Sequence, residues 1–169
     1  MKGKVFSVNI SVAKGQPKDM VKSAVAKPGY GLEGDAHAGP GSRQVSLLAV
    51  EDIEKAEKSC SGGAMDFRPG IFAENITTEG VDFSAVRVGD CILVAETVVL
   101  RVSQIGKECH DGCEIQKKTG QCVMPKRGIF AVVERGGEIR PQDSVELPQE
   151  RRPVSFWGKV LGKKNEDRY

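Results

Sequence analysis

Residues 86–105 of the chain read VRVGDCILVAETVVLRVSQI, and this run holds three of the short apolar patterns that are typical of β-strands. Its connectors are tight, and Gly89-Asp90 is one of them. Short strands at such close spacing predict a mostly β fold, either a barrel or a sandwich. The expected strands of this kind are Ile71–Thr77, Val86–Val88, Cys91–Ala95, Val98–Ile105, Ile129–Val133 and Asp143–Leu147.

The flanking sequence supplies the other expected elements. Phe6, Val8, Ile10 and Val12 alternate with polar residues, which predicts a half-buried strand with these four on one face. Residues 43–48 read as a strand that runs into a helix at about Val50–Lys58, where apolar residues recur at helical spacing. Residues 29–41 hold five glycines and are expected to form a loop. Gly136-Gly137 suits a two-residue hairpin turn, since both positions can take positive φ.

Residues 68–73 (RPGIFA) and 126–131 (KRGIFA) form a short internal repeat. Each copy precedes a turn aspartate and a further strand, which predicts two similar strand units that face each other. The alternative is that Gly-Ile-Phe-Ala simply begins strands well.

Composition and charge narrow the class of protein. The chain has 169 residues, 39% hydrophobic and 28% charged, which suits one packed domain, expected at residues 1–148. No apolar run approaches a membrane span, and the alternating N-terminus is unlike a signal peptide, so we expect a soluble, cytoplasmic protein with reduced cysteines. A net charge of +2 argues against a nucleic-acid partner. Residues 149–169 form a basic tail, with six Lys or Arg against three Asp or Glu.

Cys109 is the strongest candidate for a reactive group. Lys107 precedes it by two residues and His110 follows it, and nearby cations favour the thiolate, which attacks electrophiles or binds a soft metal. The alternative is a structural zinc site, for which the spacing is irregular. Its ligands would be Cys109, His110, Cys113 and Cys122.

The glycine-rich loop is the second candidate site. Arg43 and Gln44 follow it directly, and Lys126 and Arg127 lie in another turn, so together these segments could hold a phosphorylated ligand. The spacing matches neither a P-loop nor a dinucleotide fingerprint, which argues against ATP and NAD. The alternative is two ordinary turns with surface cations, and a lone loop histidine such as His37 is more often structural than catalytic.

Several ordered motifs resemble the stand-alone bacterial form of the MOSC domain, a family named after the C-terminal domain of molybdenum cofactor sulfurase. The similarity spans about residues 5–147. The motifs are Gly31-Leu-Glu-Gly-Asp-Ala-His-Ala-Gly39, Arg43-Gln-Val-Ser-Leu-Leu48, Phe72-Ala-Glu-Asn-Ile-Thr-Thr-Glu-Gly80, Val88-Gly89-Asp90 and Cys109.

This resemblance implies a closed, mostly β barrel with a few short peripheral helices and a functional cysteine at Cys109. In family members that bind the molybdenum cofactor, with molybdenum or tungsten, this cysteine ligates the metal and loop residues hold the pterin phosphate. Carried onto matching positions, Arg43 would contact the anion and Asn75 would give a polar contact, while Asp35 and His37 would shape the loop. Lys126 and Arg127 are added as cofactor-binding residues on charge and position alone.

Two functions follow as expectations. The first is a cofactor-handling protein or small reductase, in which the Cys109 thiolate holds the metal and a separate protein donates electrons. The second is a sulfur carrier, in which a Cys109 persulfide, formed with a cysteine desulfurase or cofactor-biosynthesis protein as partner, supplies a metal–sulfur centre and Cys113 resolves it. Nothing in the chain resembles the aminotransferase half that holds pyridoxal phosphate in larger relatives, so that label is expected to apply at the family level only.

Overall fold

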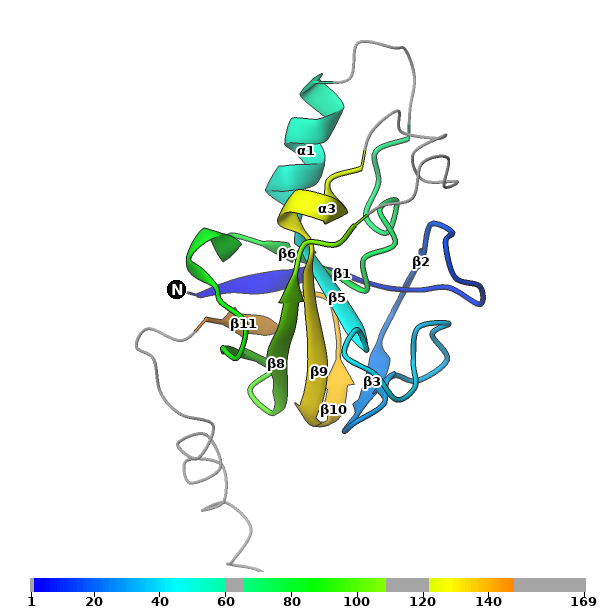
Figure 1. The fold of residues 1–169 in the computed structure, drawn as a ribbon, viewed down its shortest axis with the longest axis vertical. Coiled ribbons are helices and arrows are strands. Elements are labelled where there is room, and N and C mark those ends of the chain that lie inside the picture. The colour runs from blue at the N-terminus through cyan, green and yellow to red at the C-terminus, as the bar shows by residue number, and fades with distance from the viewer. Residues whose placement is uncertain (1, 60–65, 109–121, 148–169) are drawn as a thin grey trace, which may run out of the picture.

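The computed structural model describes residues 2–59, 66–108 and 122–147, and the basic tail therefore lies outside the described residues (Figure 1). Strands dominate, as the sequence predicts, and the α-helices of the described chain are two short ones, α1 (Val50–Ser59) and α3 (Met124–Arg127). The first strands are β1 (Lys2–Ile10), β2 (Asp19–Val21), β3 (Ala24–Lys27), β4 (Gly31–Leu32), β5 (Val45–Ala49) and β6 (Ile76–Glu79). The later ones are β7 (Cys91–Val94), β8 (Val98–Ile105), β9 (Ile129–Arg135), β10 (Gly137–Ile139) and β11 (Ser144–Glu146).

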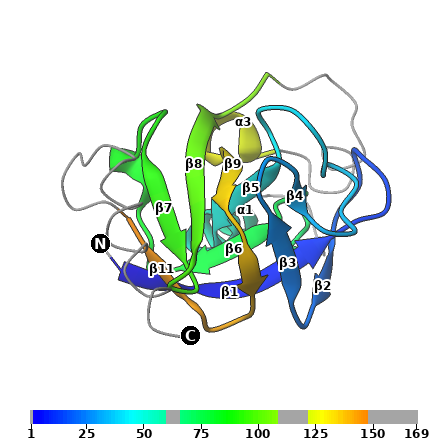
Figure 2. The ribbon, with the colours of Figure 1, turned by 90° about the horizontal axis from the view of Figure 1, so that it is seen from below.

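The main sheet closes into a barrel. Its strands follow the order β11-β7-β8-β9-β5-β6-β1, and β11 also pairs with β1, which joins the two edges of the sheet. β2 extends the sheet beyond β1. Figure 2 shows the ring of strands from below, with β1 running along one side. Closure leaves no free edge between β11 and β1, so the expectation of a closed, mostly β barrel is confirmed.

Apolar side chains fill the barrel interior. Along β5, Val45, Leu47 and Ala49 belong to the interior cluster, whereas Leu48 packs outside the wall. Because successive side chains of a strand point to opposite faces, Ser46 also faces outward. The interior is therefore a packed core, and a site built from Ser46 and its neighbours lies on the outer face of the wall.

The expected buried face of the first strand is only partly right. A bulge lies between Val5 and Ser7 in the pairing of β1 with β6, so Val5 takes the interior place expected for Phe6, which is 40% exposed. After the bulge the alternation resumes, and Val8 and Ile10 pack on the interior cluster as predicted. Val12 lies beyond the end of the strand and is 96% exposed.

One of the expected strands does not form, and another begins five residues later than predicted. In place of the first part of Ile71–Thr77 there is a turn, because the Glu74 carboxylate accepts the backbone N–H groups of Gly70 and Phe72, and β6 begins only at Ile76. In place of Val86–Val88 a 3-10 turn, Phe83–Ala85, is followed by a tight turn in which Arg87 donates its N–H to Asp90. The other expected strands form within one or two residues of their predicted bounds, except the first, which begins at Lys2, four residues before Phe6.

The expected hairpin at Gly136-Gly137 is also wrong. β10 does not return along β9 but pairs with β3 in a second sheet of order β10-β3-β4, of which β4 interrupts the glycine-rich loop. Gly136 serves close packing, since a Cβ there would overlap the carbonyl oxygen of Ala26 and lie 2.8 Å from Pro28 Cδ. Both glycines thus permit a close crossing of strands, which local sequence alone does not distinguish from a turn.

Helices α1 and α3 lie together at one end of the barrel (Figure 1). Glu51 and Asp52 in the first turn of α1 and Lys58 in its last turn complement the helix dipole. Between the helices and the barrel wall lies a second apolar cluster, which contains Leu48, Ile53, Ala56, Ile71, Phe72, Met124 and Phe130. The two Gly-Ile-Phe-Ala copies are not facing strand units, because the first forms a turn and only the second begins a strand, but their phenylalanines meet in this cluster. No described helix has the length and apolar character needed to cross a bilayer.

Candidate functional site

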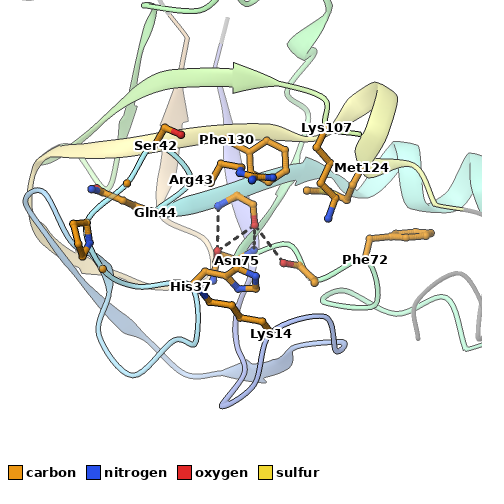
Figure 3. A pocket seen from close by; sticks show the side chains of 15 residues that line it. Lys14, His37, Ser42, Arg43, Gln44, Phe72, Asn75, Lys107, Met124 and Phe130 are labelled. Atoms are coloured by element: carbon orange, nitrogen blue, oxygen red, sulfur yellow. Dashed lines mark hydrogen bonds between the residues drawn. The ribbon is translucent and has the colours of Figure 1, made fainter. Parts of the chain in front are cut away.

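A cavity of about 440 Å³ lies against the outer face of β5 and β9, a volume in the usual range for small-ligand sites (Figure 3). Its walls come from the loop after β1, the glycine-rich loop, the turn before β6, the end of β8, α3 and β9. The lining residues are Lys14, His37, Gly39, Pro40, Gly41, Ser42, Arg43, Gln44, Ser46, Phe72, Ala73, Asn75, Lys107, Met124 and Phe130.

The charged side chains that line the cavity are all cationic. Lys14, Arg43 and Lys107 come from three separate segments, none has an ion-pair partner among the described residues, and no described carboxylate lines the cavity. Figure 3 shows Arg43 and Lys107 on one side of Asn75 and Lys14 on the other. The Arg43 guanidinium lies 5.9 Å from the centre of the Phe130 ring, within the range of a cation–π contact. The cavity is therefore suited to an anionic ligand with an apolar or aromatic part.

Asn75 forms a fixed polar floor. Its Oδ1 accepts hydrogen bonds from the Ser46 backbone N–H and hydroxyl, both at 3.1 Å, and its Nδ2 donates to the Asn9 carbonyl at 3.2 Å. The side chain is almost fully buried. These bonds use both amide atoms, so Asn75 holds the beginning of β6 against β5 and leaves at most one N–H for a ligand.

Glu74 lies behind this floor and is completely buried. Its carboxylate accepts from the N–H of Gly70 and Phe72 and from the Thr77 hydroxyl, and Thr77 in turn accepts from Asn9. Burial raises the pKa of Glu74, although the three donors act in the opposite direction. The residue ties the turn that carries Phe72 and Ala73 to the cavity wall.

A second buried group, Lys18, lies behind His37 in the wall of the cavity. Lys18 is fully buried, and its Nζ lies 2.5 Å from Asp35 Oδ1, 3.2 Å from Ser11 Oγ and 3.1 Å from His37 Nδ1. Burial lowers the pKa of Lys18, while Asp35 acts to raise it. Burial also acts to raise the pKa of Asp35, but the hydrogen bonds from the His37 backbone N–H and the Lys18 ammonium outweigh it and hold that pKa well below its ordinary value. Asp35 is therefore ionised and His37 rests on a buried ion pair.

The structure brings only some of the sequence-predicted site residues together. Arg43, Asn75 and His37 line the cavity, and Asp35 lies behind His37 without lining it. Lys126 is exposed, and Arg127 binds Asp52 of α1 with its Nε at 3.0 Å from Oδ2, so neither is at the cavity.

The cysteine predictions fall mostly outside the described residues. Cys109, His110 and Cys113 lie there, so neither the thiolate nor the zinc alternative is tested by the geometry. Cys122 is partly buried and packs against the second apolar cluster.

Several residues that line the cavity or support its wall are not among those predicted from the sequence. Lys14 and Lys18 lie in a polar loop with no motif of their own, and only the fold brings them to the glycine-rich loop. Phe72 and Phe130 carry a signal, since they share the repeated Gly-Ile-Phe-Ala, but that signal predicted strands rather than a cavity wall. Lys107 is noticeable in the sequence only as a neighbour of Cys109.

Comparison with known proteins supports the same architecture. Residues 33–146 match the family model of the MOSC domain. By structure the chain is similar to the YuaD protein from Bacillus subtilis, with a TM-score of 0.70 and 18% identity over 87% of this chain and 96% of that one.

Two further similar structures are YiiM proteins. That from Escherichia coli has a TM-score of 0.66 and 22% identity over 89% of this chain and 71% of that one. That from Geobacillus stearothermophilus has a TM-score of 0.66 and 17% identity over 98% and 86%. No curated protein matches the chain by sequence. At these identities the structural likeness establishes the fold alone.

Proposed function

The chain belongs to the MOSC domain family, and from that premise we propose that its cavity binds the molybdenum cofactor. Arg43, Lys14 and Lys107 would hold the phosphate, Phe130 would contact the ring system, and the Cys109 thiolate would ligate the metal. The protein would then act in cofactor handling or as a small reductase that takes electrons from a separate protein.

The supporting observation is the three-cation lining of the cavity. Three cations converge from segments far apart in the sequence, and no described carboxylate neutralises them there. Keeping like charges together costs free energy unless a ligand compensates it, so this arrangement favours a ligand with more than one negative charge. A phosphorylated pterin has that charge and also a planar ring, for which Phe130 and Phe72 provide apolar contact.

The described residues fit this group. The cavity volume suits a compact ligand, the cations suit a phosphate, and the Asn75 floor is held rigidly by Ser46 and Asn9. When bound, the cofactor supplies a metal centre capable of oxygen-atom and electron transfer. The chain's own contribution is to neutralise the ligand's charge, to orient its ring against a fixed floor and to exclude water with the glycine-rich loop.

Cys109 enters this proposal from the family motif and from its place in the chain. It follows the cavity-lining Lys107 by two residues, so the segment that leaves the cavity wall is the one that carries the thiol. Metal ligation requires the deprotonated sulfur, and cofactor occupancy is therefore expected to fall at acid pH.

The alternative function, a persulfide carrier, does not require a cationic cavity. A sulfur carrier needs an accessible thiol and a partner protein, whereas three convergent cations are a feature of ligand binding. The cavity therefore favours the cofactor over the carrier, and the experiment below separates them.

The test is to purify the full chain from a host that makes the cofactor and to measure molybdenum, tungsten and oxidised pterin per protein. We expect near-stoichiometric metal and pterin in the wild type, a roughly ten- to hundredfold loss of affinity in Arg43→Ala and Lys107→Ala, as for a lost charge-assisted bond, and loss of metal in Cys109→Ser. Lys126→Ala is the matched control, because it removes an exposed cation away from the cavity.

Two results would contradict the proposal. One is a wild type free of metal and pterin under conditions that load another MOSC protein. The other is a mass increase of one sulfur atom after incubation with a cysteine desulfurase and cysteine, absent from Cys109→Ser, in a protein that never holds metal. Loss of cofactor in Lys126→Ala equal to that in Arg43→Ala would shift the anion contact to the turn predicted from sequence.

A further inference from the structure

The ammonium group of Lys18 has as many acceptors as protons. Its neighbours are Asp35 Oδ1 at 2.5 Å, Ser11 Oγ at 3.2 Å and His37 Nδ1 at 3.1 Å, and the side chain has no exposed surface. A buried lysine must find partners for its N–H groups within the protein, and these three atoms supply one each.

The role of each neighbour can be assigned from its other bonds. The Ser11 hydroxyl donates to the Ala13 carbonyl at 3.0 Å, so its oxygen is free to accept from Lys18. Asp35 accepts from the Ser11 and His37 backbone N–H groups as well as from Lys18, as an ionised carboxylate does. The third proton of Lys18 is then directed at His37 Nδ1.

The opposite assignment, in which His37 Nδ1–H donates to Asp35, has poor geometry. The distance from Nδ1 to Asp35 Oδ2 is 3.6 Å, which is too long for a hydrogen bond, whereas Nδ1 lies 3.1 Å from Lys18. An Nδ1 that accepts a hydrogen bond carries no proton, so a neutral ring must carry its proton on Nε2.

We propose that Lys18 is a positioning residue that fixes His37 as the neutral Nε2–H tautomer, so that this wall of the cavity presents an N–H donor to an anionic or oxo group of the ligand. The ring lines the cavity and is 34% exposed, and among the described residues no hydrogen bond occupies Nε2. The part of this proposal that concerns the ligand rests on the proposed function, whereas the tautomer itself does not.

The consequence is a definite chemical role for His37. With its proton on Nε2 it donates a hydrogen bond and is not a general base towards the cavity. In this tautomer Nδ1 accepts from the Lys18 ammonium, and the neutral ring carries no charge of its own. The wall therefore supplies a donor without a further full charge.

The test is long-range proton–nitrogen correlation NMR of the full chain labelled with 15N, at neutral pH and without added ligand. The chain has two histidines, so the ring signals that disappear in His37→Gln belong to His37. We expect a protonated Nε2 and an unprotonated Nδ1. A ring protonated on Nδ1, or on both nitrogens, in the wild type overturns the proposal.

The part played by Lys18 is tested with Lys18→Met. In this variant we expect His37 to leave the Nε2–H state, either by moving its proton to Nδ1 towards Asp35 or by gaining a second proton. Lys14→Met is the control. It removes a cavity lysine that does not contact Nδ1, and we expect it to leave the tautomer unchanged. Because Lys18→Met leaves Asp35 buried without its partner, Lys18→Met/Asp35→Asn provides a second variant with no buried charge, in which we expect a mixture of tautomers. A pure Nε2–H ring in both Lys18 variants would show that Lys18 does not set it.

These outcomes are independent of cofactor loading. If purified protein never holds molybdenum or pterin but His37 is the Nε2–H tautomer, the proposed function fails and the role of Lys18 stands. If cofactor is bound and the ring is protonated on Nδ1, the proposed function stands and the role of Lys18 fails.

Discussion

At the scale of single residues, the two buried carboxylates beside the cavity differ in what balances their burial. Asp35 has the Lys18 ammonium at 2.5 Å, and its pKa lies well below the ordinary value, so its contribution to stability is present above about pH 4 and is lost as the pH falls. Glu74 has only neutral donors, and burial raises its pKa above the ordinary 4.5. Its contribution is present below that value and is lost as the pH rises.

The variant Glu74→Gln tests whether the contribution of Glu74 to stability is lost as the pH rises. The free energy of unfolding of the wild type minus that of Glu74→Gln is expected to be largest near pH 4 and to fall as the pH rises towards about 7, by up to about 1.4 kcal/mol per pH unit until Glu74 ionises in the folded state. Urea unfolding followed by circular dichroism at several pH values measures it. Asp35 is present in both proteins, so its effect cancels, and a difference that grows with pH would mean that the three donors outweigh burial.

Gly70 is a position where a side chain cannot be accommodated. Its φ is +85°, and a Cβ would overlap the Lys18 carbonyl oxygen and lie 3.3 Å from Asn9 Cγ. Gly70→Ala is expected to lower the free energy of unfolding by about 2–4 kcal/mol, since both strain and overlap act. Gly34→Ala is the matched control, because its φ of +82° gives similar strain while no atom lies within 4 Å of its Cβ. Equal losses in the two variants would attribute the cost to φ alone.

Only some of the residues at the cavity can be predicted from the sequence. Arg43, Asn75 and His37 are predictable because they stand in ordered motifs that resemble a known family, and all three line the cavity. Lys14 and Lys18 are not, because their role depends on the loop after β1 meeting the glycine-rich loop across the fold. Arg127 lies away from the cavity, and a cation in a turn gives no indication in the sequence that a buried aspartate on another element binds it.

At the scale of elements, the ion pair between Arg127 and Asp52 holds the four-residue helix α3 against α1 and so places Met124 at the cavity. Asp52 is nearly buried and Arg127 is 40% exposed. A double-mutant cycle with Asp52→Asn and Arg127→Gln is expected to give a coupling energy of about 1 kcal/mol or more, above that of an exposed pair. Lys55 lies 3.7 Å from Asp52 on the same helix and is left in place throughout the cycle.

The pair Arg101 and Glu134, which joins β8 and β9 on the surface, is the comparison for this cycle, with both side chains at least one-third exposed. It is expected to couple by less than about 1 kcal/mol. If the two cycles give the same energy, α3 is held by the apolar contacts of Met124 rather than by the ion pair.

Most strands follow from their apolar patterns, and the exceptions have physical causes that a pattern does not contain. The bulge at Phe6 reverses the alternation of β1 halfway along its length, and only the pairing with β6 reveals it. Gly136 and Gly137 satisfy the rule for a hairpin turn equally well, but the strand after them finds β3 instead of β9. Glu74 turns a stretch of apolar residues into a bend by binding its own backbone.

At the scale of the whole molecule, stability and binding belong to opposite faces of one wall. The interior face of β5 and β9 packs the barrel with Val45, Leu47 and Ala131, while the outer face offers Ser46 and Phe130 to the cavity. A closed barrel resists deformation because every strand of the ring is paired on both sides, and this rigidity fixes the floor of the cavity.

The ring depends on β11, a strand of only three residues that pairs with β1 on one side and β7 on the other. Val145 and Leu147 at this strand are buried in the interior cluster, which contributes about 1.5–3 kcal/mol for each side chain. A chain ending after residue 148 keeps this strand and is expected to unfold with the free energy of the full chain to within about 1 kcal/mol, as for changes outside the cooperative core. A chain ending after residue 142 loses both side chains and both ladders, a loss comparable with the whole stability of a typical domain.

We therefore expect the 1–148 chain to unfold cooperatively in urea and the 1–142 chain to show no cooperative transition. The one tryptophan lies at position 157 and is removed in both, so far-UV circular dichroism is the appropriate probe. Val145→Asp in the full chain gives an independent check, because it places an unpaired charge in the barrel interior while the chain keeps its length. A cooperative 1–142 chain with the wild-type midpoint would show that β1 and β7 hold the barrel without the closing strand, and a 1–148 chain that fails to fold would extend the domain into the basic tail.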